Sequence, residues 1–205
     1  MASGWDGKTD FVNPMCGSGT LAIEAALMAL NKYPGLLRAY YSFMHIEGYN
    51  DEYYQSIRTE GRAIALKSTP AKIIATDINP NAINATRMNA QTAGVDHIID
   101  FEVCDFRDTK VPLDNPGVVM INPEYGERLG EYEDLEIIYK AIGDFLKTAC
   151  QGYKGFIFTA SPNLAKKVGL KASQKTEFFN SKLECRLLAY ELYGGSKREP
   201  KIVSQ

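Results

Sequence analysis

The most restrictive feature of this sequence is the alternation of short apolar runs with longer stretches of helical periodicity. The apolar runs fall at 11–14, 72–77, 98–105, 117–122 and 155–161. Helix-forming stretches lie between them at 20–31, 51–67, 79–94 and 132–150, with a short one at 162–170. Such alternation is typical of a mostly parallel sheet covered by helices on both faces. The sequence therefore predicts an α/β fold.

The end of the chain breaks this pattern. Two apolar runs, 175–179 and 183–193, are separated only by the polar turn Asn180-Ser181-Lys182. This spacing predicts a hairpin, so the last strand should run antiparallel. With the five earlier runs it brings the expected sheet to seven strands.

An insertion is expected at about 32–50, after the first helix, because this stretch has no clean period. The helix that follows it is expected to fray or bend near Gly61. For the insertion's Tyr40, Tyr41 and Phe43 we favour packing over the sheet above contact with nucleic acid, because aromatic side chains mostly serve burial.

Composition bounds the class of protein. The 205 residues are 45% apolar and 23% charged, an ordinary globular balance that predicts one domain over 1–205. The net charge of −2 predicts no broad nucleic-acid footprint, so any basic surface must be local or supplied by another domain. No apolar run approaches the roughly 20 residues that span a membrane.

The four cysteines argue for a protein of the reducing cytoplasm. They lie far apart, at positions 16, 104, 150 and 185, and only two histidines accompany them. This spacing offers no metal site and favours the cysteines as small core residues. The sequence therefore predicts no metal.

A glycine-rich segment, Asn13-Pro-Met-Cys-Gly-Ser-Gly-Thr20, joins the first predicted strand to the first helix. Gly17 and Gly19 let the backbone turn tightly and approach a ligand, and the helix behind them offers free N–H groups. The segment lacks the lysine of a phosphate-binding P-loop, and Ala22 stands where a dinucleotide fingerprint has its third glycine. A nucleoside ligand without a pyrophosphate is therefore expected.

Two acids end the next two predicted strands. Asp77 is placed to accept the hydroxyls of a ribose, and Asp105 to accept an adenine amine. A ribose, an adenine and a short zwitterionic tail describe S-adenosylmethionine. The alternative for each acid is a helix N-cap or a solvated strand end.

The fourth predicted strand runs into Asn122-Pro123-Glu124-Tyr125. Methylation of an exocyclic amine requires that the nitrogen be held and aimed at the methyl donor. The Asn122 amide carbonyl and the Pro123 backbone carbonyl can each accept one N–H, and Tyr125 offers a face for a flipped base. The segment therefore predicts a site for a planar amine.

Four segments together resemble the large-subunit ribosomal-RNA guanine-N2 methyltransferase family: "PMCGSGTLAIEAA", "TDINPNAINATRMNAQTAG", "INPEYGERLGE" and "FFNSKLECRLLAYEL". The resemblance runs from about Ser3 to Tyr193. It implies a class I, Rossmann-like three-layer sandwich that uses S-adenosyl-L-methionine in the cytoplasm. It also implies that this chain is the methyltransferase part of a longer protein, which would bind ribosomal RNA through an N-terminal THUMP domain.

The same resemblance implies the site residues. Asn122, Pro123 and Tyr125 would be catalytic. The cofactor would be bound by Pro14, Cys16, Gly17, Gly19, Thr20, Asp77, Ile78, Asp105, Phe106 and Asn122.

The chain departs from the family pattern twice, with Glu124 where the family has a second proline and Asn13 where it has an aspartate. These departures leave other functions open. The same loop would serve an adenine-N6 methyltransferase or a glutamine-N5 enzyme. A module that binds cofactor or RNA without turnover is a further alternative, and a nicotinamide-dependent oxidoreductase is the least supported.

Overall fold

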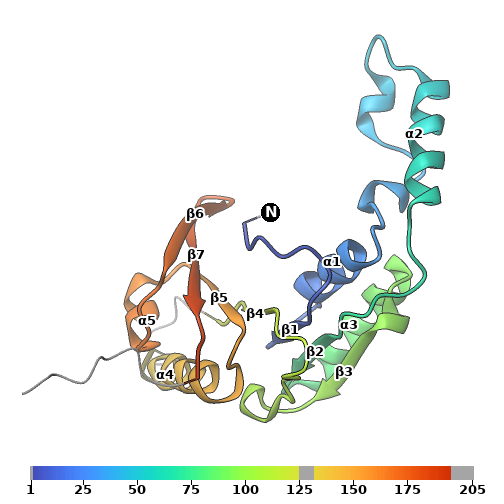
Figure 1. The fold of residues 1–205 in the computed structure, drawn as a ribbon. Coiled ribbons are helices and arrows are strands. Elements are labelled where there is room, and N and C mark those ends of the chain that lie inside the picture. The colour runs from blue at the N-terminus through green and yellow to red at the C-terminus, as the bar shows by residue number, and fades with distance from the viewer. Residues whose placement is uncertain (1, 125–131, 195–205) are drawn as a thin grey trace, which may run out of the picture. The chain divides into compact units, whose positions relative to one another are not determined.

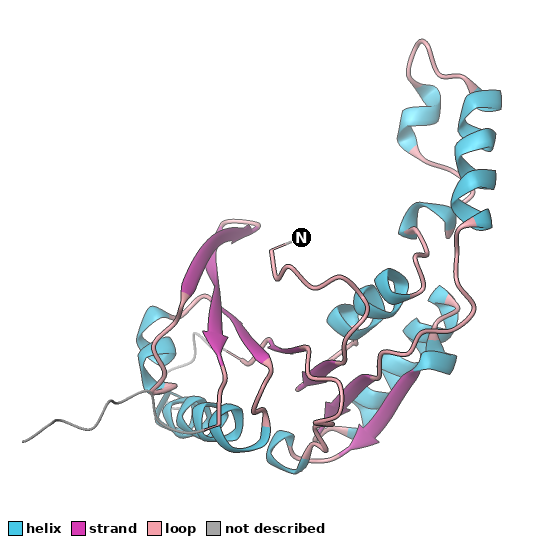
Figure 2. Cartoon of the chain, viewed as in Figure 1, coloured by secondary structure: helices cyan, strands magenta, loops and turns pink. Residues whose placement is uncertain are grey.

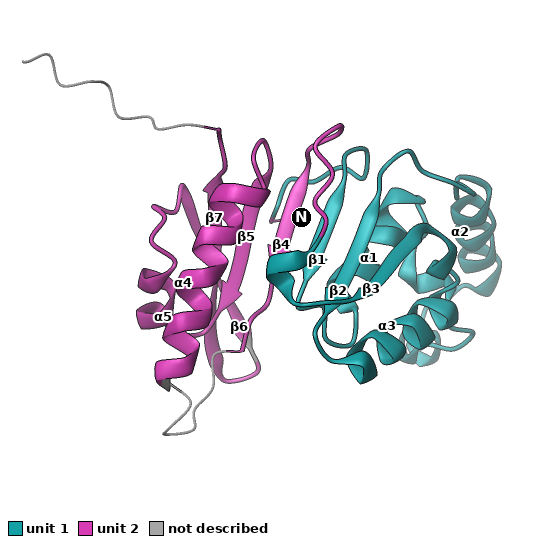
Figure 3. Ribbon diagram, turned by 90° about the horizontal axis from the view of Figure 1, so that it is seen from below, with its two compact units in different colours: residues 1, 3–109 teal, residues 2, 110–205 magenta. Residues whose placement is uncertain are grey.

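A computed structural model describes residues 2–124 and 132–194 (Figure 1). The chain divides into two compact units, the first formed by residues 3–109 and the second by the residues from Lys110 onward (Figure 3). The expected single-domain organisation stays a prediction.

The first unit is built on three parallel strands in the order β3-β2-β1. Val12, Ile73 and Ala75 are fully buried, as expected for the near-continuous apolar runs of a parallel sheet. Helices α1 and α3 contact the strands and each other. The bounds of these elements are β1 Phe11–Pro14, α1 Thr20–Ala29, β2 Ile73–Asp77, α3 Pro80–Ala93, η3 Asp96–Ile98, β3 Ile99–Val103 and η4 Phe106–Asp108.

Helix α3 shows how the sequence sets its own ends. The Asn79 side chain accepts a hydrogen bond from the backbone N–H of Asn81 at 2.9 Å, and Pro80 takes the first helical position. Gly94 ends the helix in the left-handed conformation, with φ of 64°. These are the expected N- and C-terminal signals, and the prediction of this helix is confirmed.

The insertion and the helix that follows it form one substructure, in which loops join η1 (Pro34–Leu36), η2 (Ser42–His45) and α2 (Asp51–Ala63) (Figure 2). This whole stretch, residues 31–65, is called the insertion from here on. Hydrogen bonds from Leu66 N to Leu30 O (2.7 Å) and from the Asn31 side chain to Ile64 O (3.2 Å) close its base. Helix α2 continues through Gly61 and ends at Ala63 rather than at residue 67.

The aromatic side chains of the insertion do not cover the sheet, so that prediction is wrong. Phe43 contacts the rings of Tyr41, Tyr49 and Tyr54 at centroid distances of 5.4, 6.1 and 5.3 Å. Tyr40 is 85% exposed. No pattern in the sequence predicts that the insertion brings four aromatic rings together, because they come from segments without a shared period.

The second unit has four strands in the order β4-β5-β7-β6. β4 and β5 are parallel, whereas β7 runs antiparallel to both β5 and β6, so the terminal hairpin is confirmed. The elements are β4 Val118–Ile121, α4 Tyr132–Ala149, β5 Lys154–Thr159, α5 Pro162–Lys167, β6 Gln174–Asn180 and β7 Leu183–Glu191. With the three strands of the first unit, the described residues hold the expected seven strands, most of them parallel.

Helices α4 and α5 pack together in the second unit. Gly143 permits their close approach, because a Cβ there would lie 1.8 Å from the carbonyl oxygen of Val168. Tyr139 and Leu146 of α4 are fully buried, and the Tyr139 hydroxyl is 2.8 Å from the hydroxyl of Thr159 at the end of β5. This packing fixes the carboxyl end of β5, the strand paired with β4.

Candidate active site

The glycine segment turns sharply between β1 and α1 in the first unit. Gly17 and Gly19 both have positive φ, 58° and 86°. A Cβ on Gly19 would lie 2.3 Å from Cγ2 of Thr86, whereas a Cβ on Gly17 would meet nothing within 4 Å. Gly19 is therefore required by close packing on α3, and Gly17 leaves open space on the outer side of the loop.

Asp77 holds this loop in place from the end of β2. Its Oδ2 accepts a hydrogen bond from the backbone N–H of Gly17 and its Oδ1 accepts one from Asn79, both at 2.9 Å. A carboxylate has about four acceptor sites, so Asp77 can still accept hydrogen bonds from a ligand. The N-cap of α3 is Asn79, so Asp77 is not the capping residue that the alternative proposed.

Two side chains of α3 complete the support of the loop. The Thr86 hydroxyl donates to the carbonyl of Gly17 at 2.8 Å, and the Asn89 amide donates to that of Ser18 at 3.0 Å. The sequence reasoning missed both residues. Their signal was available, because Thr86 and Asn89 are polar residues three positions apart and so lie on one face of a predicted helix.

Cys16 has a structural environment. Its side chain is 9% exposed and its sulfur is 3.6 Å from the Thr86 hydroxyl. Burial raises the pKa of the Cys16 thiol to about 11, so the group stays protonated at neutral pH. All four cysteines are free, and three of them are buried, as expected of small core residues.

Asp105 follows β3, next to β2 in the parallel sheet. It accepts hydrogen bonds from the Arg107 guanidinium at 2.6 and 2.8 Å and from the Arg107 backbone N–H at 2.9 Å. The ion pair with Arg107 holds the pKa of Asp105 below its usual range, against the opposing effect of burial. The capping alternative describes Asp105 correctly, since the side chain caps η4.

Apolar side chains adjoin both acids. Ile78, directly after Asp77, is 69% exposed, whereas Phe106, directly after Asp105, is buried. The Arg107 guanidinium lies 5.5 Å from the centre of the Phe106 ring. The first unit thus brings together the open side of a glycine loop, two carboxylates and an exposed apolar side chain, the groups that a nucleoside requires.

The second unit carries the described part of the predicted amine site. Asn122 and Glu124 are exposed and Pro123 is buried, directly after the fully buried Ile121. The Asn122 amide is therefore accessible at the carboxyl end of β4. Tyr125 lies outside the described residues, so its stacking role stays a prediction.

The remaining predicted positions lie at the loop as well. Pro14 is the buried last residue of β1, and Thr20 is the exposed first residue of α1. Asn13, which replaces the family's aspartate, is 1% exposed. Among the described residues, no helix is long and apolar enough to cross a membrane, and no cluster of three or more His, Cys, Asp or Glu side chains is suited to a metal ion.

Comparison with known families gives this geometry its context. The model of the UPF0020 family, the RMKL-like methyltransferase domain, matches residues 1–189. The chain belongs to this family. The resemblance noted in the sequence is confirmed at this level.

A sequence relative of this RMKL-like domain is the ribosomal RNA large subunit methyltransferase K/L of Syntrophotalea carbinolica. It is 38% identical over 187 residues, which are 88% of this chain and 26% of that protein. The chain spans about a quarter of the length of the curated relatives it matches.

Two solved structures share the fold of the RMKL-like domain. SMU.472, in complex with SAH, matches with a TM-score of 0.84 at 27% identity, over 95% of this chain and 51% of that one. A predicted N6-adenine-specific DNA methylase from Listeria monocytogenes matches with a TM-score of 0.78 at 29% identity, over 90% of this chain and 47% of that one. The Rossmann-like methyltransferase fold is thereby confirmed.

Proposed function

We propose that this chain carries out S-adenosylmethionine-dependent methylation of an exocyclic amine on a ribosomal-RNA base, with guanine N2 as the favoured target. The observation that carries the proposal is the hydrogen bond from Gly17 N to Asp77 Oδ2. It fixes a glycine loop next to a carboxylate that retains acceptor sites, which is the arrangement that a ribose needs at the end of a strand.

The chain's own residues fit S-adenosylmethionine. The open space outside Gly17 admits the ligand, and Asp77 accepts the ribose hydroxyls. Asp105 accepts the adenine amine and Ile78 covers the ring. The complex of SMU.472 with SAH supports this choice of ligand class. When bound, the cofactor supplies an electrophilic methyl group on a sulfonium, so that positioning becomes the main task of the protein.

The amine is held from the end of β4. The Asn122 amide oxygen and the Pro123 carbonyl each accept one N–H of the base, which frees the nitrogen lone pair from conjugation with the ring and prepares it for methylation. The bound cofactor would supply the methyl group to this nitrogen and would leave as the neutral thioether, and the nitrogen proton would pass to solvent. Tyr125 stacks on the extruded base.

The RNA substrate is supported by the relatives, which are named as ribosomal RNA large subunit methyltransferases. Adenine N6 is the second candidate, because the Listeria monocytogenes neighbour is described as a predicted N6-adenine-specific methylase. Both amines are planar and carry two hydrogens, so the Asn-Pro pair alone does not choose between them. Since the relatives are much longer, an N-terminal RNA-binding THUMP domain would belong to the same proposal.

The test uses unmodified 23S ribosomal-RNA transcript and isotope-labelled S-adenosylmethionine, followed by digestion of the RNA and mass spectrometry of its nucleosides. We expect N2-methylguanosine. N6-methyladenosine would establish the second candidate instead.

Replacement of Asn122 by alanine should reduce transfer by roughly a hundredfold or more, as for the loss of a positioning hydrogen-bond partner in other enzymes. Binding of S-adenosylhomocysteine, measured by calorimetry, should be weakened far less. Full transfer by Asn122→Ala would contradict the assigned role. Cofactor binding by the wild type without any transfer would instead favour a non-catalytic module.

A further inference from the structure

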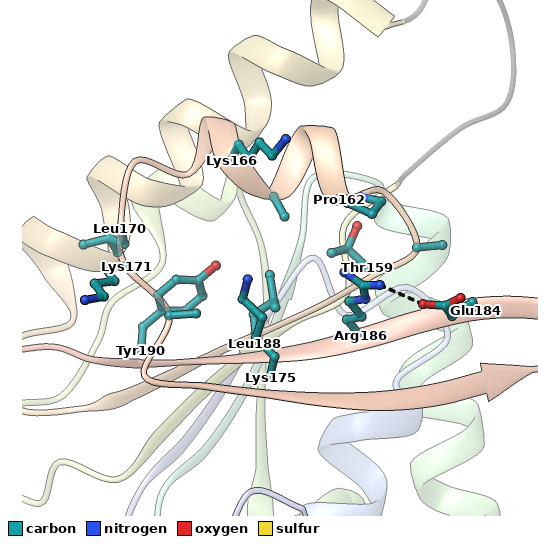
Figure 4. Close-up of a pocket in the computed structure, with 13 residues that line it drawn as sticks. Thr159, Pro162, Lys166, Leu170, Lys171, Lys175, Glu184, Arg186, Leu188 and Tyr190 are labelled. Atoms are coloured by element: carbon teal, nitrogen blue, oxygen red, sulfur yellow. Dashed lines mark hydrogen bonds and ion pairs between the residues drawn. The ribbon is translucent and has the colours of Figure 1, made fainter.

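A hollow lies in the second unit, on one face of the hairpin. It has a volume of about 560 Å³ and lies between α5, the segment that follows it, and strands β6 and β7 (Figure 4). This volume is in the range of ligand-binding pockets, roughly 300–1,000 Å³. None of the residues predicted from the sequence to bind cofactor or amine lines it.

The lining is strongly cationic. The charged residues of the lining are the basic Lys166, Lys171, Lys175 and Arg186 and the acidic Glu184. Arg186 pairs with Glu184 at 2.8 Å. Within residues 2–124 and 132–194, no carboxylate pairs with the three lysines. The hollow therefore carries a formal charge of +3 from these five groups, on a chain whose net charge is −2.

The strands explain why the lining side chains of β6 and β7 share one face of the hairpin. Side chains two residues apart on a strand share a face, so Arg186, Leu188 and Tyr190 point to the same side of β7. Lys175 of β6 is the direct partner of Leu188. Figure 4 shows the Lys175 amine and the Tyr190 hydroxyl both facing α5.

Tyr190 adds a neutral hydrogen-bond donor to the lining of the hollow. The side chain is 2% exposed, and burial raises the pKa of its hydroxyl to about 12, with a smaller contribution from Tyr139. The hydroxyl therefore stays protonated at neutral pH and can donate to an anion. Phosphate oxygens accept such bonds while the ammonium groups balance their charge.

The hollow begins next to the predicted amine site. Ile121 of β4 pairs with Ile157 of the parallel strand β5. Asn122 and Pro123 directly follow Ile121. Thr159, which lines the hollow, comes two residues after Ile157. Adjacent strands are about 4.8 Å apart, so both features lie at the same sheet edge, one strand from each other.

We propose that this hollow, defined by Lys166, Lys171, Lys175 and Arg186, binds backbone phosphates of the RNA strand that carries the target base. The inference rests on the proposed function. Phosphate contacts carry no sequence information but fix the position of a strand. Here they would hold the nucleotides that flank the base at Asn122.

The experiment measures binding of fluorescein-labelled decauridylate to the chain by anisotropy, with S-adenosylhomocysteine present, at several salt concentrations. The test variant combines Lys166→Ala, Lys171→Ala and Lys175→Ala. Its affinity should fall at least tenfold. The slope of log K against log salt should shrink by about 2, because each phosphate contact on a single strand contributes roughly 0.7.

Two single-residue controls each remove one positive charge outside the hollow. Lys167, the neighbour of Lys166 on α5, pairs instead with Glu136 at 2.7 Å. Lys154 begins β5 and pairs with Glu191 at 3.8 Å. Lys167→Ala and Lys154→Ala should each bind RNA within twofold of the wild type. If the triple variant does not fold, the two single variants Lys166→Ala and Lys167→Ala repeat the comparison.

Calorimetry with S-adenosylhomocysteine separates this proposal from the proposed function. Equal RNA affinity and equal salt slope in the wild type and the triple variant would overturn the phosphate site and leave the methyltransferase assignment standing. A wild type that binds the homocysteine compound but not decauridylate at low salt would also overturn it. A wild type that binds neither S-adenosylhomocysteine nor decauridylate would count against the proposed function itself.

Discussion

In the sequence, the glycine loop directly precedes α1 and the insertion directly follows it, yet different kinds of contact stabilise the two segments. The loop at 14–20 is held by hydrogen bonds that Thr86 and Asn89 donate and by one that Asp77 accepts, and these residues belong to other elements of the unit. The insertion at 31–65 is held mainly by contacts among its own aromatic rings and by the bonds at its base. Changes in the loop should therefore disturb the predicted ligand site, whereas changes in the insertion should remain local.

The largest expected effect comes from Gly19→Ala. The new Cβ would lie 2.3 Å from Thr86 and would also force a left-handed φ of 86° on alanine. Strain and overpacking together should lower the free energy of unfolding by about 2–4 kcal/mol. Urea unfolding would measure this loss, and calorimetry should show that S-adenosylhomocysteine binding is abolished.

Gly17→Ala is the matched control for this change. Its Cβ would meet nothing within 4 Å, although its φ is also positive, at 58°. It should lose only about 1 kcal/mol of stability, the cost of the left-handed conformation alone. Equal losses for the two variants would show that packing on Thr86 does not hold the loop.

Asp77→Asn should have the next largest effect. Both Asp77 oxygens accept from backbone N–H groups, so an amide would place its own NH₂ against one of these donors. The loop would lose a bond to a charged group, worth about 1.5–3 kcal/mol. We expect the dissociation constant for S-adenosylhomocysteine to rise more than tenfold by calorimetry.

Asp105→Asn tests the same change at the neighbouring strand end. It weakens the pair with Arg107, whose side chain is 63% exposed, and leaves an oxygen that can accept the adenine amine. Less than a fivefold loss of affinity is expected, in keeping with the small value of exposed ion pairs. A larger loss than that of Asp77→Asn would reverse the assigned order of the two acids.

The pH dependence of the Asp105 contact has a definite sign. Arg107 lowers the pKa of Asp105, so the carboxylate stays ionised down to a lower pH than an ordinary aspartate. Its contribution to binding is lost only as pH falls through the lowered pKa. Affinity for S-adenosylhomocysteine should therefore stay level through this group from about pH 8 to about pH 5. A decline within that window that Asp105→Asn removes would show that burial raises the pKa of this carboxyl more than Arg107 lowers it.

Phe43→Ala should have a smaller and local effect. Phe43 is 43% exposed and contacts Tyr41 and Tyr54 within the insertion. Aromatic contacts of this kind contribute about 0.5–1.5 kcal/mol. Hydrogen exchange should quicken in residues 33–63 with S-adenosylhomocysteine affinity unchanged within twofold. A clear loss of affinity would show that the insertion supports the ligand site.

The contrast also explains what the sequence could predict. The loop, Asp77 and Asp105 follow from their place at strand ends, because a parallel sheet brings such ends to one edge. The spacing of Thr86 and Asn89 shows that they share a face of α3, but it does not show that this face meets the loop. The aromatic cluster could not be predicted, because its rings come from segments without a shared period. The pairing of Asp105 with Arg107 also escaped prediction, since it depends on the turn of η4.

The smallest effect, and one whose sign tests the packing of the insertion, is expected for Gly61→Ala. Gly61 lies within α2, where alanine is favoured by about 1 kcal/mol. The new Cβ would stand 3.1 Å from Cδ2 of Tyr33 and 3.4 Å from Leu36, which opposes that gain. Tyr33 is 49% exposed, so its ring can move aside at little cost. We therefore expect a net gain of about 0.5 kcal/mol in urea unfolding, and a net loss would show that Tyr33 and Leu36 hold α2 rigidly in place.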